Sequence, residues 1–199
     1  MMTDCISGKK YIYHFVHNLE NFSGAAFQGS RLAREVNDQE GYECAIINKC
    51  TDNKYRNESV DGLSVTHVPG NVVLRIFCLL HLFLVKRIDL VHIHGYEDAV
   101  FFVSLIFKKK IFLKSTIVGE DFESLSRKRS RFFLRLISKV AYNNALSTPI
   151  YEINKRYTSN ISIIPNFIEV LTKVAVTEKD NLFLVVGAVC ERKRTYESI

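Results

Sequence analysis

The βαβ pattern near the N-terminus is the feature that most constrains the fold of this chain. Residues 11–16 form a β-branched and aromatic run that predicts a strand. Apolar side chains recur at helical spacing in residues 25–36, and residues 42–48 form a second apolar run. The two strands of a strand, helix, strand unit lie parallel. We therefore expect an α/β fold built on a parallel sheet.

The alternation of strands and helices continues along the chain. Further strands are predicted in residues 63–68, 89–95, 111–116, 144–148 and 161–164. Helices are predicted in residues 71–86, 97–107 and 124–140, and another starts at Pro149. Residues 51–61 are polar without periodicity, which predicts a surface loop. A chain of 199 residues can hold one good α/β core, whereas two complete domains would be tight.

The composition indicates which kinds of partner the chain can bind and in which cellular compartment it is expected. A net charge of +6 favours anionic partners such as nucleic acid, a membrane surface or phosphorylated small molecules. The five cysteines form no C-x-x-C pair, so we interpret them as reduced. Residues 1–10 lack the apolar core of a secretory signal. The most apolar helical stretch, residues 72–85, is shorter than the roughly 20 residues that span a bilayer. We expect a cytoplasmic protein.

The C-terminal stretch has the pattern of a phosphate-binding unit. Residues 182–186 are an apolar run that ends at Gly187, which predicts a buried strand and a turn. A cationic segment follows, and residues 195–199 resemble the opening of a helix. We therefore expect a second domain to begin here.

Five segments of this sequence, taken together, resemble the glycosyltransferases of family 4, which have the two-domain GT-B fold. The segments are Asn21-Phe22-Ser23-Gly24-Ala25, residues 32–36 with 41–44, residues 89–95, residues 164–169 and residues 186–193. Each is unspecific alone, but they occur in the family's order over nearly the whole chain. The resemblance implies a Rossmann-like parallel sheet with helices on both faces, the N-terminal half of a GT-B fold, followed by a truncated C-terminal domain.

The resemblance also implies a division of the chain and a set of partners. Residues 1–165 are expected to form the acceptor-binding Rossmann-like domain and residues 166–181 the interdomain connector. Residues 182–199 are expected to begin the domain that binds a nucleotide-diphosphate sugar. No metal or other cofactor is expected, because cationic side chains and a helix N-terminus neutralise the leaving diphosphate in such enzymes.

The donor-binding residues follow from the same resemblance. Lys193 falls where the family places its phosphate-contacting lysine, and Gly187 lies at the preceding turn. The family often has arginine directly after that glycine, whereas this chain has Ala188, so Arg192 or Arg194 would take over. The alternative is that these cations form a solvated turn without a ligand.

Gly24 completes the predicted donor site. It is expected to let the backbone approach the diphosphate, or else simply to make a tight turn into the first helix.

The acceptor side departs from the family pattern. A common form is Thr-x-His-Gly-x-Asp, and the matching residues 116–121 have Val118 in place of the histidine. Valine cannot hydrogen-bond a sugar hydroxyl or donate a proton. Glu120 or Asp121 could face the cleft instead, since sites in α/β folds are built at the carboxyl ends of strands. The alternative is an acidic pair that matches the positive end of a helix.

Two histidines share one face of a predicted central strand. His92 and His94 alternate with apolar residues, and a spacing of two can serve metal ligands. No carboxylate or cysteine cluster supports a metal, so we interpret both as packed core histidines. His94 lies nearest the strand end and is the candidate to line the cleft.

The predicted helix of residues 124–140 carries six cations beside an apolar stripe. They are Arg127, Lys128, Arg129, Arg131, Arg135 and Lys139. This pattern favours peripheral membrane contact, and the alternative is a helix packed on the sheet with a solvated basic side. Nucleic acid is not expected, because aromatic residues are not interleaved with the cations on an exposed sheet.

The function that the resemblance implies is transfer of a sugar from a nucleotide-diphosphate donor to a saccharide or lipid-linked acceptor. The process would be surface polysaccharide or lipopolysaccharide biosynthesis, at the inner face of the cytoplasmic membrane, with retention at the anomeric carbon. An alternative is a non-catalytic acceptor-binding or membrane-binding half whose donor domain is a complementary chain or has been lost by gene disruption. A simple nucleotide-binding module is a third interpretation.

Overall fold

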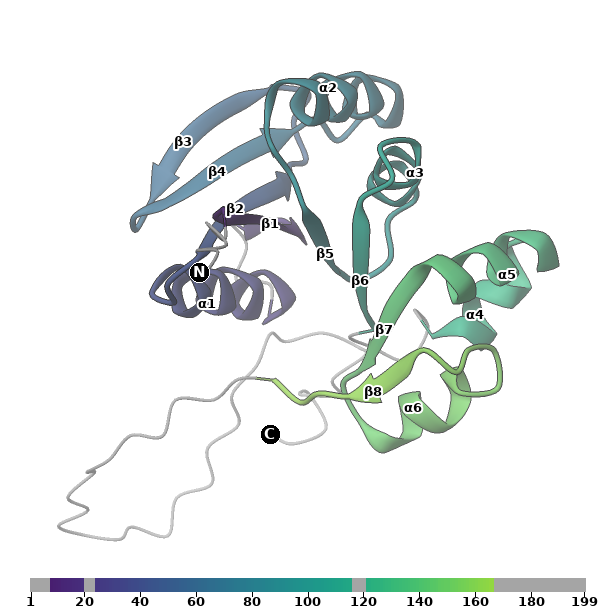
Figure 1. The fold of residues 1–199 in the computed structure, drawn as a ribbon. Coiled ribbons are helices and arrows are strands. Elements are labelled where there is room, and N and C mark those ends of the chain that lie inside the picture. The colour runs from purple at the N-terminus through teal and green to yellow at the C-terminus, as the bar shows by residue number, and fades with distance from the viewer. Residues whose placement is uncertain (1–7, 20–23, 116–120, 167–199) are drawn as a thin grey trace, which may run out of the picture. The chain divides into compact units, whose positions relative to one another are not determined.

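The computed structural model describes residues 8–19, 24–115 and 121–166, and these form one sheet flanked by helices (Figure 1). The strands are β1 (Lys10–His17), β2 (Tyr42–Lys49), β3 (Arg56–Val60), β4 (Leu63–Val68), β5 (Leu90–His94), β6 (Lys110–Ser115), β7 (Ala141–Ala145) and β8 (Ile161–Ile163). The helices are α1 (Gly24–Asn37), α2 (Val72–Val85), α3 (Asp98–Ile106), α4 (Phe122–Lys128), α5 (Arg131–Val140) and α6 (Thr148–Asn154).

The sheet of the described residues has the strand order β3-β4-β2-β1-β5-β6-β7-β8. Every neighbouring pair runs parallel except β3 and β4. β1 therefore lies near the middle, paired with β2 on one side and with β5 on the other. The predicted parallel α/β fold is confirmed, and the carboxyl ends of its parallel strands meet at one edge of the sheet.

Alternation along the strands separates two cores on the two faces of the sheet. Tyr13 and Phe15 of β1 join the larger core, which includes buried side chains of α2, α3 and α5. Val16 of β1 joins a smaller core with Ala26 and Ala33 of α1. Helices thus cover both faces, as predicted, with α1 on the face opposite α2 and α3 (Figure 1).

The loop predicted for residues 51–61 is wrong in its second half, which forms strand β3. β3 pairs antiparallel with β4 at the sheet edge, and only one of its faces is partly covered. Such an edge strand needs few apolar residues, so periodicity does not reveal it. Asp61 (φ 47°) and Gly62 (φ 79°) connect the two strands, a pair of positive φ values typical of a type I′ hairpin turn.

The single helix predicted for residues 124–140 is also wrong, because two helices occupy this stretch. Arg129 has extended backbone (φ −131°, ψ 158°) and ends α4. Ser130 then caps α5, and its hydroxyl accepts a hydrogen bond from the Phe133 amide at 3.3 Å. β7 begins at Ala141, directly after α5, so the predicted strand of residues 144–148 starts three residues early in the structure.

A buried ion pair joins the N-terminal turn of α2 to that of α3. Arg75 Nη2 lies 2.9 Å from Glu97 Oε1, and both side chains are buried. Arg75 Nη1 also donates to the carbonyls of Pro69 (2.9 Å) and Gly70 (2.6 Å). Glu97 Oε2 accepts from the Val100 amide at 2.9 Å and so caps α3. The pair fixes where the loops after β4 and β5 leave the sheet.

We expect Arg75→Met to lower the free energy of unfolding by about 3–5 kcal/mol, because it leaves the Glu97 carboxylate buried without its charge partner. Urea unfolding followed by circular dichroism measures the change. The matched control is Arg127→Ala, which removes an exposed ion pair with Glu123 and should cost about 1 kcal/mol or less. Equal losses in the two variants would contradict this account of the Arg75 pair.

Candidate functional site

The carboxyl edge of the sheet collects the described members of the predicted site. Gly24 begins α1 after β1, His94 ends β5, and Asp121 precedes α4 after β6. The structure therefore brings the segments that carry these three residues to the same edge of the sheet. The other predicted site residues, Glu120, Gly187, Arg192 and Lys193, lie outside the described residues.

Two glycines of α1 differ in what their surroundings require. A Cβ atom on Gly24 would meet no atom within 4 Å, and Gly24 lines a cavity of about 400 Å³. A Cβ atom on Gly29 would lie 2.7 Å from Val16 Cγ1 and 3.2 Å from His94 Nε2. Gly29 is therefore the residue that lets α1 approach β1 and β5 closely. Gly29 was not among the predicted site residues, although a glycine inside a helical pattern is a signal for close packing.

Asp121 is the N-cap of α4. Its Oδ1 accepts from the Ser124 amide at 2.8 Å, and its Oδ2 accepts from the Ser124 hydroxyl at 3.0 Å. Asn154 of α6 holds the same turn, since its Oδ1 accepts from the Phe122 amide at 2.8 Å. These contacts match the alternative of an acidic residue at the positive end of a helix. A catalytic role for Asp121 stays a prediction.

A third histidine joins the two that the sequence analysis placed on one face of β5. The register of the sheet sets His14 of β1 opposite His92. The His92 and His94 rings stack with centroids 4.0 Å apart, and His14 Nδ1 lies 3.2 Å from His94 Nε2. All three side chains are buried, as expected for His92 and His94. His14 was missed because only strand pairing brings it to the others.

The three imidazoles are neutral at physiological pH. Burial, and secondarily the charge of Lys114, lowers the pKa of His14 to about 4. Burial is also the main reason why the pKa values of His92 and His94 lie well below the ordinary value. Burial lowers the pKa of Lys114 too, and its Nζ donates to Asn166 Oδ1 at 2.9 Å. Neutral imidazoles can accept hydrogen bonds, take up protons or ligate metals.

A cavity of about 460 Å³ opens beside these histidines on the α1 face of the sheet. Its wall is largely apolar, with polar groups from His14, Gln28, His92, Lys114 and Asn144. An apolar cavity with a few convergent polar groups and shifted pKa values is the usual form of a small-molecule site. The structure thus favours this cavity as a second part of the candidate site, which the sequence analysis did not foresee.

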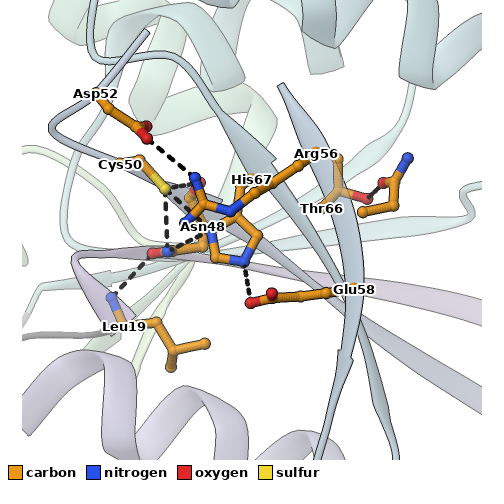
Figure 2. A network of polar contacts seen from close by, with 9 residues as sticks. Leu19, Asn48, Cys50, Asp52, Arg56, Glu58, Thr66 and His67 are labelled. Carbon is orange, nitrogen blue, oxygen red and sulfur yellow. Dashed lines mark hydrogen bonds and ion pairs between the residues drawn. The ribbon is translucent and has the colours of Figure 1, made fainter. Parts of the chain in front are cut away.

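A separate polar network lies at the carboxyl ends of β2 and β4 (Figure 2). Asn48 Oδ1 accepts from the Leu19 amide at 3.0 Å and so anchors the loop that leads to α1. His67 Nε2 lies 2.6 Å from Glu58 Oε1, and His67 Nδ1 lies 2.9 Å from Cys50 Sγ. Because a carboxylate only accepts, His67 donates from Nε2, while its Nδ1 lies 3.2 Å from Asn48 Nδ2, an amide nitrogen that only donates. The network ties the hairpin of β3 and β4 to the candidate site.

The fold and the arrangement of this edge define a class of protein: an α/β Rossmann-like domain of the kind that forms half of a GT-B fold. The S. aureus MnaA–UDP co-structure is similar to this chain, with a TM-score of 0.55 and 12% sequence identity. The likeness covers 79% of this chain and 44% of that chain. At this identity it shows the fold alone.

No protein-family model matches the sequence, and no curated protein matches it. Membership of glycosyltransferase family 4 therefore stays a prediction. Among the described residues, no helix is long and apolar enough to cross a membrane.

We expect opposite behaviour from the two glycines of α1. Gly29→Ala should lower the free energy of unfolding by about 1–3 kcal/mol, because the added methyl group overpacks the contact with Val16 and His94. Gly24→Ala is the matched control in the same helix, and it should change stability by less than about 1 kcal/mol. Denaturant unfolding of both variants measures the difference. A Gly29→Ala variant as stable as the wild type would show that α1 does not need this close approach.

Proposed function

We propose that this chain is the acceptor-binding part of a GT-B glycosyltransferase of the family 4 type. It takes part in the transfer of a sugar from a nucleotide-diphosphate donor to a saccharide or lipid-linked acceptor, in surface polysaccharide or lipopolysaccharide biosynthesis. The observation that carries the proposal is the carboxyl edge of the parallel sheet, where Gly24 at the start of α1, His94 at the end of β5 and the N-terminus of α4 follow three neighbouring strands, β1, β5 and β6. The similarity in fold to MnaA, solved with UDP, supports a nucleotide-linked substrate.

The proposed donor half begins within this chain. Residues 1–165 form the acceptor domain, residues 166–181 connect the domains, and residues 182–199 begin the donor domain. Gly187 provides the turn, while Arg192 and Lys193 neutralise the charge that develops on the departing diphosphate. The bond from the anomeric carbon to the phosphate oxygen breaks, the acceptor oxygen forms the new glycosidic bond with retention, and the proton of the acceptor hydroxyl passes to the departing diphosphate.

On the acceptor side we assign roles to three residues. Asp121 caps α4, and we assign to Glu120, which lies outside the described residues, the contact with the acceptor. His94 is buried and does not line the cavity itself, but its Nδ1 has no partner among the described residues, and we assign it to accept a hydrogen bond from an acceptor hydroxyl that reaches the end of β5. Positioning supplies much of the rate in such a reaction.

We expect the 199-residue chain to bind uridine or guanosine diphosphate, or their sugars, in a calorimetric titration. Lys193→Ala should weaken this binding at least tenfold, or about 1.4 kcal/mol, because it removes a cation from the diphosphate. Lys128→Ala, which removes an exposed cation of α4, is the control and should leave the affinity unchanged. A folded chain that binds none of these ligands would contradict the donor-site assignment.

A second candidate function is that of a membrane-associated, non-catalytic half that works with a complementary donor-domain chain. The surface of α5 favours it. Leu134 and Ile137 pack inward, whereas Phe132 is 76% exposed and lies among cations such as Arg131 and Arg135. An exposed aromatic ring beside basic side chains is the pattern of an interfacial helix. This chain then resides in the cytoplasm, on the inner face of the cytoplasmic membrane.

We expect the chain to co-sediment with vesicles that contain anionic lipid and not with neutral vesicles. Arg131→Gln with Arg135→Gln should weaken the binding about thirtyfold, since each cation near the surface contributes about 1 kcal/mol. Lys54→Gln with Lys86→Gln removes two exposed cations from other parts of the fold and serves as the charge-matched control. Equal losses in both double variants would indicate a general charge effect and contradict a specific role for α5.

A further inference from the structure

The buried histidine trio, His14, His92 and His94, leaves hydrogen-bonding capacity unused. Three ring nitrogens, His14 Nε2, His92 Nε2 and His94 Nδ1, have no partner among the described residues. Buried polar atoms without partners are rare, and each requires an explanation such as a bound water or ion. The rings of His14 and His92 line the cavity of about 460 Å³, and the ring of His94 packs against both, so a ligand can reach the trio from the cavity.

The geometry of the histidine trio suits a metal ion. One ligand atom from each residue can be chosen so that all three lie within 4.8 Å of one another. His14 Nδ1 and His94 Nε2, which are hydrogen-bond partners of each other and not among the unpartnered atoms, lie 3.2 Å apart, so a metal ion between them would replace the proton that they share. Two nitrogens bound tetrahedrally to zinc at about 2.0–2.1 Å lie about 3.3 Å from each other.

The ligand chemistry of the histidine trio also suits a metal. Histidine ligates through an unprotonated ring nitrogen, and each of the three residues can offer one such atom. Imidazole ligands suit zinc, cobalt, nickel and copper, whereas magnesium and calcium prefer oxygen ligands. The described residues supply no carboxylate to this group of three. The expected ion is therefore a late transition metal.

We propose that His14, His92 and His94 form a binding site for one divalent late transition metal ion such as Zn²⁺. Because His14 and His92 line the cavity of about 460 Å³, the fourth coordination position is open to water or to an oxygen of a small ligand. The proposal does not depend on glycosyl transfer. The sequence predicts no metal because His92 and His94 have no third ligand nearby in the chain, and the pairing of β1 with β5 supplies it.

The positive charge of Lys114 opposes metal binding, so removal of this charge tests whether the affinity for the metal rises. Its charge acts on all three rings, while its Nζ is held by Asn166. Replacing this cation with a neutral side chain of similar length should strengthen metal binding, because one repulsive charge is removed. A site elsewhere on the chain would not respond to this change. Lys114→Met should therefore bind Co²⁺ more tightly than the wild type.

The experiment is a titration of the chelator-treated chain with Co²⁺, followed by visible absorption. We expect one equivalent to bind with the intense bands of a tetrahedral site, and His14→Gln or His92→Gln to weaken binding more than tenfold. His81→Gln, which changes an exposed histidine of α2, should bind like the wild type. X-ray absorption of the wild-type complex should count about three imidazole ligands, and this measurement does not depend on the folding of any variant.

Three results would overturn the proposal. The first is a folded wild-type chain that binds no Co²⁺ or Zn²⁺ after chelator treatment. The second is binding that His14→Gln and His92→Gln leave unchanged. The third is a sulfur-to-metal charge-transfer band that disappears in Cys50→Ser, which would place the ion at the network of Cys50 and His67 instead.

Discussion

The pairing of β1 with both β2 and β5 is the constraint on which the rest of the structure depends. It determines which residues of the central strands point to each face of the sheet. Phe15 and Ile93 enter the larger core, while His14 and His92 face α1. A slip of one residue would exchange the two faces and bury imidazoles in the apolar core. The same pairing places the side chains of Val16 and His94 next to each other beneath α1. They lie so close to the helix that only a glycine fits at position 29. The position of α1 and the polar character of the face beneath it thus both follow from the register of β1.

The two faces of the sheet have different energetic roles. The face toward α2 and α3 is apolar. Among the ion pairs described, it holds one buried pair, Arg75 and Glu97, and additional hydrogen bonds stabilise both charges. The face toward α1 keeps neutral imidazoles and an ammonium group in a poorly solvated place. Burial of polar atoms without partners is unfavourable, so the face toward α1 lowers the free energy of unfolding, while it supplies the reactive groups. That division locates the chemistry on the α1 side.

Local patterns predicted most of the architecture, because strand and helix periodicity depends on neighbours in the chain. The failures have specific physical causes. The strand β3 is polar because its outer edge faces solvent, although the Asp61-Gly62 pair was a usable hairpin signal. Ser130 interrupts a stretch whose apolar spacing continues across the break. In the candidate site, His94 was predicted from its strand, whereas His14 and Gly29 depend on register and on packing between distant segments, which no local pattern contains.

The distance in sequence between the members of the histidine trio has a consequence for folding. His14 and His94 are 80 positions apart, so their contact closes a long loop, whereas the hairpin of β3 and β4 closes a short one. During synthesis β1 emerges from the ribosome well before β5, and until β5 arrives one flank of β1 has no strand to pair with. The contact between His14 and His94 therefore forms only when the centre of the sheet is complete.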